Sequence, residues 1–292
     1  MKLKPLLSIL LIYLVTATYA QDFEKVNITT TKLTAHIYML QGAGGNIGVS
    51  IGEDGIFIID DQFAPLSKKI LAAIKKISDK PFKFLVNTHY HGDHAGGNEN
   101  MTKAGATIIA HDNVKKRLSK PQRNGTLKPK DALPVITFND KLNITINGES
   151  ILVFHVANAH TDGDVMLYFT KSNVLHTGDT YFSKRYPYID VYSGGSVHGF
   201  IEATKRALLF IDDDTKIIPG HGELSNKEEY KSYLNMLETL RNNIQTAIDM
   251  GKTEAEIKAD VSLTKIYDDL GYGTGLNTAE IRVNFYRSLV KK

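Results

Sequence analysis

Two kinds of hydrophobic pattern alternate along the chain, and they predict strands and amphipathic helices. Short apolar or alternating runs bounded by glycine, proline, asparagine and aspartate are typical of strands. These runs lie at positions 33–40, 46–51, 56–60, 82–86, 106–110, 141–146, 150–156, 165–170, 173–176 and 216–218. The pair Asn147-Gly148 and the stretch Gly52-Glu53-Asp54-Gly55 stand between neighbouring runs, where they favour hairpin turns.

Apolar residues at helical spacing predict the helices. The clearest stripe lies within 227–250, and we interpret it as a packing face. It consists of Tyr230, Tyr233, Leu237, Leu240, Ile244 and Ile248. Further helices are predicted at 65–77, from about His94 onward, and at 113–118, 196–211, 253–259 and 278–290. Each half of the chain has strands followed by helices, which favours an α/β fold built as a four-layer αββα sandwich with the helices outside.

Two polar segments lack any periodicity. Residues 119–133 are rich in lysine, proline, glycine and asparagine, and they predict a long surface loop. The stretch Gln41-Gly42-Ala43-Gly44-Gly45 predicts a mobile loop. No helix follows it, which argues against a role in binding phosphate.

Residues 1–20 are typical of a secretory signal peptide. Two lysines precede an apolar run that is too short to span a bilayer, and small residues close the segment. We therefore expect a mature chain of one domain, 21–292, that is secreted or periplasmic and free of the membrane after cleavage. An uncleaved anchor is the alternative.

Composition narrows the classes of partner and ligand. The formal net charge of the 292 residues is +3, and Lys2 and Lys4 of the signal contribute two of these charges. The mature chain is thus close to neutral, which argues against nucleic acid as a partner and favours a small-molecule substrate. The chain has no cysteine, so disulfides are excluded and any metal ligand must be His, Asp or Glu. The oligomeric state stays open.

A cluster of potential metal ligands follows the apolar run 82–86. His89 and His91 alternate along the extended end of this predicted strand, so their rings face the same side. Asp93 and His94 come next, where the chain turns. Four ligand-type side chains within six residues exceed what one tetrahedral ion takes from so short a segment, so the arrangement indicates two ions.

Three further candidates each follow a predicted strand, where side chains converge on the edge of a sheet. They are His160, Asp179 and His221. Each is a weak signal alone, but together with the cluster they give five histidines and two aspartates. Asp60 and Asp61 end another predicted strand, and a carboxylate there either holds a ligand histidine or belongs to an ordinary turn.

The signature His89-Tyr90-His91-Gly92-Asp93-His94, followed by the three spaced candidates, resembles the metallo-β-lactamase-fold hydrolases. The resemblance covers nearly all of the mature chain. It implies two zinc ions, the first held by His89, His91 and His160. It implies that the second is held by Asp93, His94 and His221, with Asp179 bridging the two.

The resemblance also implies the chemistry. A hydroxide between the ions would be the nucleophile, Asp93 would orient it, and the first ion would polarise a scissile carbonyl. Such ions lower the pKa of bound water toward neutrality. Aspartate at position 179 matches lactonases and hydroxyacylglutathione hydrolases better than the β-lactamases that carry cysteine there. The sequence therefore predicts a secreted zinc hydrolase acting on a β-lactam, lactone or related ester or amide.

Three alternatives stay open. The first two are a di-metal phosphodiesterase and a glyoxalase II-like thioester hydrolase on the same fold. The third is a metal-binding protein without catalytic activity. For substrate binding we interpret three residues of the loop after Asp179 and the next helix as candidates: Lys184, Arg185 and His198.

Overall fold

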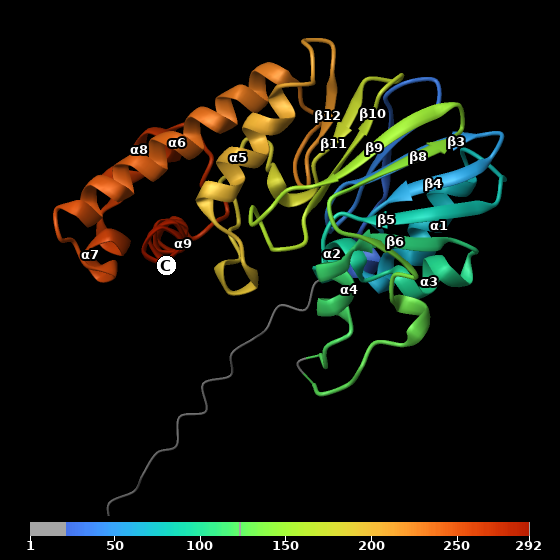
Figure 1. Cartoon of the computed structure of the whole chain (residues 1–292), viewed down its shortest axis with the longest axis horizontal. Helices are drawn as coiled ribbons and strands as arrows, with labels where there is room; N and C mark the ends of the chain where they lie inside the picture. Colours follow the sequence, from blue (N-terminus) through green and yellow to red (C-terminus); the bar gives the residue numbers. More distant parts are fainter. Residues whose placement is uncertain (1–21, 123, 292) are drawn as a thin grey trace, which may run out of the picture.

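The computed structural model describes residues 22–122 and 124–291, so the predicted signal segment lies outside the described residues. Two β-sheets pack face to face, and helices cover their outer faces (Figure 1). The predicted four-layer sandwich is confirmed. Within the described part of the chain, we find no helix that combines the length and the apolar character needed to cross a membrane.

The first sheet contains seven strands in sequence order, antiparallel as far as β4 and parallel beyond it. They are β1 (Thr29–Lys32), β2 (Ile37–Gln41), β3 (Ile47–Gly52), β4 (Gly55–Ile59), β5 (Phe82–Asn87), β6 (Thr107–His111) and β7 (Ile136–Phe138). The helices of this half are α1 (Ser67–Lys75), α2 (Gly92–Ala95), α3 (Asn98–Lys103) and α4 (Asp112–Leu118). Helix α1 packs on the sheet because Leu66, Ile70 and Ile74 recur at helical spacing and are buried.

The second sheet has the order β12-β11-β10-β9-β8, antiparallel except for the pair β11–β12. Its strands are β8 (Lys141–Ile146), β9 (Glu149–His155), β10 (Val165–Phe169), β11 (Val174–His176) and β12 (Lys216–Ile218). The helices are α5 (Val197–Leu208), α6 (Lys227–Asp249), α7 (Glu254–Ala259), α8 (Lys265–Asp269) and α9 (Thr278–Val290). Short 3₁₀ turns are η1 (Phe23–Lys25), η2 (Ala64–Leu66), η3 (Lys130–Ala132), η4 (Gly178–Thr180), η5 (Val191–Ser193) and η6 (Val261–Leu263).

The predicted packing stripe on α6 is buried as expected at Tyr230, Tyr233 and Leu237, which pack with residues of α5 and of the second sheet. Between the sheets, the rings of Phe57 and Phe169 meet edge to face with centroids 6.1 Å apart. This contact is typical of the favourable geometry for buried aromatic pairs.

The pattern of apolar residues missed two strands. β1 is polar throughout and has no buried residue, so it carries no alternation to detect. β7 is only three residues long. The hairpin turn at Asn147-Gly148 is present, and both residues have positive φ (54° and 72°), as a type I′ turn requires.

The two sheets are joined by hydrogen bonds at the edge where several strands end. The Thr88 carbonyl accepts from the Val165 amide at 2.9 Å, and the Gly220 carbonyl accepts from the Asn46 amide at 2.7 Å. His176 of β11 adds a third link, because its Nε2 lies 3.1 Å from the Asn46 carbonyl. The loops that leave β4, β5, β9, β11 and β12 are therefore held close together.

The burial of His176 predicts that part of the free energy of unfolding is lost at acidic pH. Burial lowers the pKa of His176 to about 4, from an ordinary value of 6.5. The unfolded chain therefore binds this proton at higher pH than the folded chain, and stability falls as the pH drops from about 6.5 toward 4. In metal-free protein we expect this group to remove up to about 3 kcal/mol of unfolding free energy over that window.

Urea unfolding of the metal-free wild type and of His176→Gln, at pH 7 and at pH 4.5, checks this expectation. The variant should lose less stability on acidification than the wild type. An equal loss in both proteins would contradict it and would assign the acid sensitivity to other groups.

Candidate metal centre

The turn after β5 places four of the predicted ligands. His91 is the N-cap of α2 and has extended backbone angles, while the His94 and Ala95 amides donate to its carbonyl. The Asp61 amide donates to the His94 carbonyl, and Asp61 Oδ1 accepts from the Gly97 amide at 2.8 Å. The short helix is thus tied to the end of β4, which fixes the direction of its side chains.

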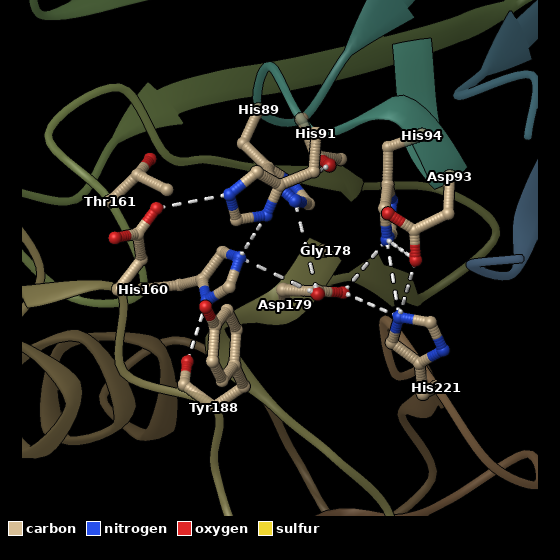
Figure 2. Close-up of polar contacts among 12 residues, drawn as sticks. His89, His91, Asp93, His94, His160, Thr161, Gly178, Asp179, Tyr188 and His221 are labelled. Carbon is tan, nitrogen blue, oxygen red and sulfur yellow. Dashed lines mark hydrogen bonds and ion pairs between the residues drawn. The ribbon is translucent and has the colours of Figure 1, made fainter. Parts of the chain in front are cut away.

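The structure brings together all seven ligand candidates that the sequence analysis named, as Figure 2 shows. Their donor atoms form two groups, and within each group the atoms lie within 4.8 Å of one another. The first group is His89, His91, His160 and Asp179. The second group is Asp93, His94 and His221.

Asp179 lies between the groups, with one carboxylate oxygen toward each. Its Oδ1 is 3.0 Å from His94 Nε2 and 3.4 Å from His221 Nε2. Its Oδ2 is 3.6 Å from His160 Nε2 and 3.8 Å from His89 Nε2. This is the arrangement expected of a carboxylate that bridges two ions.

Each of four histidines has its outer ring nitrogen engaged. The Tyr188 carbonyl lies 2.6 Å from His160 Nδ1, and a carbonyl oxygen can only accept, so this nitrogen carries the proton. Asp60 Oδ2 lies 2.7 Å from His94 Nδ1, and Asp190 Oδ2 lies 3.1 Å from His91 Nε2. Of the two aspartates that end the preceding strand, Asp60 holds a ligand histidine, whereas Asp61 accepts from the Gly97 amide.

His89 is oriented through a hydroxyl. The Thr88 Oγ1 donates to Asp60 Oδ2 at 2.7 Å, which leaves its oxygen to accept from His89 Nδ1 at 3.1 Å. Each of these four imidazoles therefore has a hydrogen-bond partner at its outer nitrogen. Their inner nitrogens face the centre of the site, where they can bind a metal ion.

The inward lone pairs make the site suitable for cations. His160 Nε2 and His91 Nδ1 are only 2.8 Å apart, and with both protons on the outer nitrogens two lone pairs face each other. His89 Nε2 and Asp179 Oδ1 are buried and have no hydrogen-bond partner among the described residues. Imidazole and carboxylate ligands of this kind fit divalent metal ions, zinc typically.

The electrostatics of the site agree with this donor set. Burial lowers the pKa of His89 well below its ordinary value and that of His160 to about 4, so both are neutral ligands at pH 7. Burial alone also lowers the pKa of His221, but the Asp179 and Asp93 carboxylates together outweigh it and raise the pKa to about 9. The negative potential that favours a proton on His221 favours a metal cation at the same place.

Glycine residues allow the close packing around the ligands. A methyl group at Gly45 would overlap the His94 imidazole, and one at Gly220 would overlap Asp179 Oδ1. The Gly45 amide also donates to the Asp93 carbonyl at 3.0 Å. The glycine-rich stretch 41–45, predicted to be a mobile loop, is therefore packed against the site.

A cleft of about 420 Å³ opens onto the ligands. Apart from the ligands His91, Asp93, Asp179 and His221, its lining consists of Gly92 and the aromatic residues Phe63, Phe182 and Tyr188. The ring of Phe182 is stacked on His221 with an interplanar angle of 3°. The cleft thus has one metal-binding wall and an apolar rim.

The structure does not bring the three substrate-binding candidates to this cleft. Lys184 Nζ lies 3.2 Å from Glu229 Oε1 and lines a separate pocket with Tyr181 and Tyr272. Arg185 and His198 are exposed, and neither is among the described residues that line the cleft. The loop does pass the site as expected, but it contributes the Tyr188 carbonyl and the Asp190 carboxylate instead.

The model of the metallo-beta-lactamase superfamily matches residues 44–221, which include all seven ligand candidates. The chain belongs to this superfamily.

Several relatives of this metallo-beta-lactamase superfamily member have hydrolase names. It is 26% identical over 227 residues to a linear primary-alkylsulfatase of Pseudomonas sp., covering 63% of this chain and 42% of the relative. It is 33% identical over 113 residues to a hydroxyacylglutathione hydrolase of Pelagibacter ubique, covering 38% and 41% of the two chains. The chain spans about half the length of these curated relatives or less.

Solved structures share the fold. A metallo-beta-lactamase from Pontibacter korlensis matches with a TM-score of 0.61 at 18% identity, covering 73% of this chain and 99% of that one. A sec-alkylsulfatase from Pseudomonas sp. matches with a TM-score of 0.67 at 18% identity, covering 91% of this chain and 51% of that one.

The close packing of Gly45 against His94 predicts that a larger residue at position 45 weakens binding of the second ion. Gly45→Ala should displace the His94 imidazole and weaken the second ion by about 10-fold or more. Gly92→Ala is the matched control, because a methyl group there has nothing within 4 Å. Zinc-to-protein ratios after dialysis against buffered free zinc compare the two variants. Equal zinc-to-protein ratios in the two variants would show that the close packing of Gly45 against the His94 imidazole does not position this ligand.

Proposed function

We propose that this protein is a binuclear zinc hydrolase that cleaves the carbonyl bond of a β-lactam, a lactone or a related ester or amide. The observation that carries the proposal is the bridging geometry of Asp179 between two groups of inward-facing ligands at the base of an open cleft. Two divalent ions bound there would activate water as a nucleophile and polarise a carbonyl. We further propose export of the chain, in keeping with its predicted signal segment.

Asp93 is the residue that we assign to orientation of the nucleophile and transfer of its proton. Its side chain lines the cleft and is 26% exposed, with Oδ2 3.3 Å from His221 Nε2. Burial raises the pKa of Asp93, but the hydrogen bond with His221 and the nearby His94 and His221 rings together outweigh it and lower the pKa overall. Asp93 is therefore ionised at neutral pH and able to accept a proton.

The walls of the cleft are suited to an apolar part of a substrate. Phe63, Phe182 and Tyr188 offer ring faces and edges to an apolar group. Among the described residues that line the cleft, there is no lysine or arginine to pair with an anionic ester. This lining favours a carbonyl substrate over a phosphodiester.

Sulfate-ester hydrolysis is a second candidate, supported by a specific observation. The alkylsulfatase relative aligns over 63% of this chain, and the alkylsulfatase structure covers 91% of it, more than the 73% covered by the metallo-beta-lactamase. An alkyl tail would fit the aromatic rim, and the ions would supply the charge that the side chains lack.

A substrate panel with and without metal tests both candidates. We expect zinc-loaded protein to hydrolyse at least one arm among a cephalosporin, a lactone and a hydroxyacyl thioester. Chelation should lower the rate by about 100-fold or more, because Lewis-acid stabilisation supplies several kcal/mol, and zinc should restore it. Parallel arms contain a primary alkyl sulfate and a bis-aryl phosphate.

Turnover of the alkyl sulfate alone would replace the carbonyl proposal with the second candidate, and turnover of the phosphate alone would exclude both. Undiminished turnover by metal-free protein would overturn the metal-dependent mechanism.

A further inference from the structure

The Asp190 carboxylate contacts His91 of the first ligand group at Nε2, the ring nitrogen that does not face His160. Its Oδ2 lies 3.1 Å from His91 Nε2 and accepts a hydrogen bond from the Tyr90 hydroxyl at 3.0 Å. Its Oδ1 accepts from the Ser193 amide at 3.1 Å.

The loop around Asp190 is rigidly held. The Asp190 amide donates to the His160 carbonyl at 3.1 Å. The guanidinium of Arg117 donates to the Ser193 carbonyl at 2.8 Å and lies 5.2 Å from the centre of the Tyr90 ring. The same guanidinium forms a two-pronged ion pair with Asp162. These contacts fix the Asp190 carboxylate relative to both His91 and His160.

His91 has a competing hydrogen bond within the site itself. Its Nδ1 is 2.8 Å from His160 Nε2, which lacks a proton because the Tyr188 carbonyl holds the His160 proton on Nδ1. If His91 carried its proton on Nδ1, it would donate to His160. That bond would occupy the metal-facing lone pairs of two ligands of the first ion at once.

We propose that Asp190 is a positioning residue that holds the His91 proton on Nε2 and so prevents this blocking hydrogen bond. The first ion depends on Asp190, whereas the second depends on Asp60, which holds the His94 proton at 2.7 Å. Each ion thus has its own carboxylate behind a histidine ligand. The inference rests on the proposed function only in requiring a two-metal site, and part of its test needs no metal.

Asp190→Asn separates positioning from structure. Asparagine keeps the size of the side chain but has no charge and only one acceptor oxygen, so it cannot accept from both the Ser193 amide and His91. Two-bond ¹H–¹⁵N spectra of metal-free protein at pH 8 report the tautomer of each histidine. We expect His91 to be an Nε2–H tautomer in the wild type and predominantly an Nδ1–H tautomer in the variant.

Metal binding supplies the second readout. Competition with a chromophoric chelator gives the two stepwise zinc dissociation constants, and the histidine spectra show which ligands are bound at each step. Asp190→Asn should weaken the first ion by about 10- to 100-fold and leave the second within about 3-fold. Asp213→Asn is the matched control, because Asp213 is 92% exposed, and it should change neither constant.

Two results would overturn the proposal. One is a His91 that keeps the Nε2–H tautomer, with both dissociation constants unchanged. The other is equal weakening of both ions together with a lower melting temperature of the metal-free protein, which would make Asp190 a purely structural residue.

If Asp190→Asn does not fold, Tyr90→Phe carries the test, because it removes one hydrogen bond from the carboxylate and keeps its charge. It should weaken the first ion selectively by about 2- to 5-fold, and no selective change would contradict the proposal. Selective loss of the first ion without turnover of any panel substrate would leave this inference standing and remove the proposed function.

Discussion

The site depends on where the protons of its histidines are held. An imidazole binds a metal ion through a nitrogen without a proton, so each ligand needs an acceptor at its other nitrogen. Here the acceptors differ in kind: a hydroxyl for His89, a backbone carbonyl for His160, and carboxylates for His91 and His94. The outcome is the same for all four, because the other ring nitrogen of each faces the two ligand groups.

This convergence constrains the backbone around the site. Asp60 and Gln62 are fully buried non-glycine residues with positive φ, and Gly178, beside the bridging Asp179, also has positive φ. Conformations of this kind cost of order 1–3 kcal/mol for non-glycine residues and persist where surrounding contacts fix them. Asp60 shows what fixes it, since its carboxylate accepts from the Thr88 amide, the Thr88 hydroxyl and His94. The strained residue thus connects β4 to two ligand histidines.

The residues of this site differ in how well their type and position in the sequence predict their role. The 89–94 cluster is visible because its ligands are adjacent and of the right chemical type. Asp60 is visible as a carboxylate at a strand end, although the sequence alone could not choose between its two roles. The contact between Tyr188 and His160 cannot be predicted from residue type, because the contacting atom is a backbone carbonyl that every residue possesses.

In the loop after Asp179, residue type predicted contacts with the cleft that the structure does not contain. The residue types of Lys184, Arg185 and His198 predict substrate binding, because cations and imidazoles suit an anionic or polar substrate group. Residue type does not say on which side of a loop a side chain emerges. Lys184 has a positive φ of 55° and pairs with Glu229, so it lines a pocket of its own, separate from the cleft. Asp190, farther along the same loop, makes the contact with the site.

Tyr188 contacts both the ligand set and the cleft. Its carbonyl accepts the His160 proton, while its side chain, 52% exposed, forms part of the cleft rim. A backbone contact survives most substitutions of the side chain, so the rim can vary without loss of the ligand's orientation. A rearrangement of the loop backbone, in contrast, would release His160 and, through Asp190, His91 as well. The ligand set therefore constrains the path of the loop backbone but not its side chains.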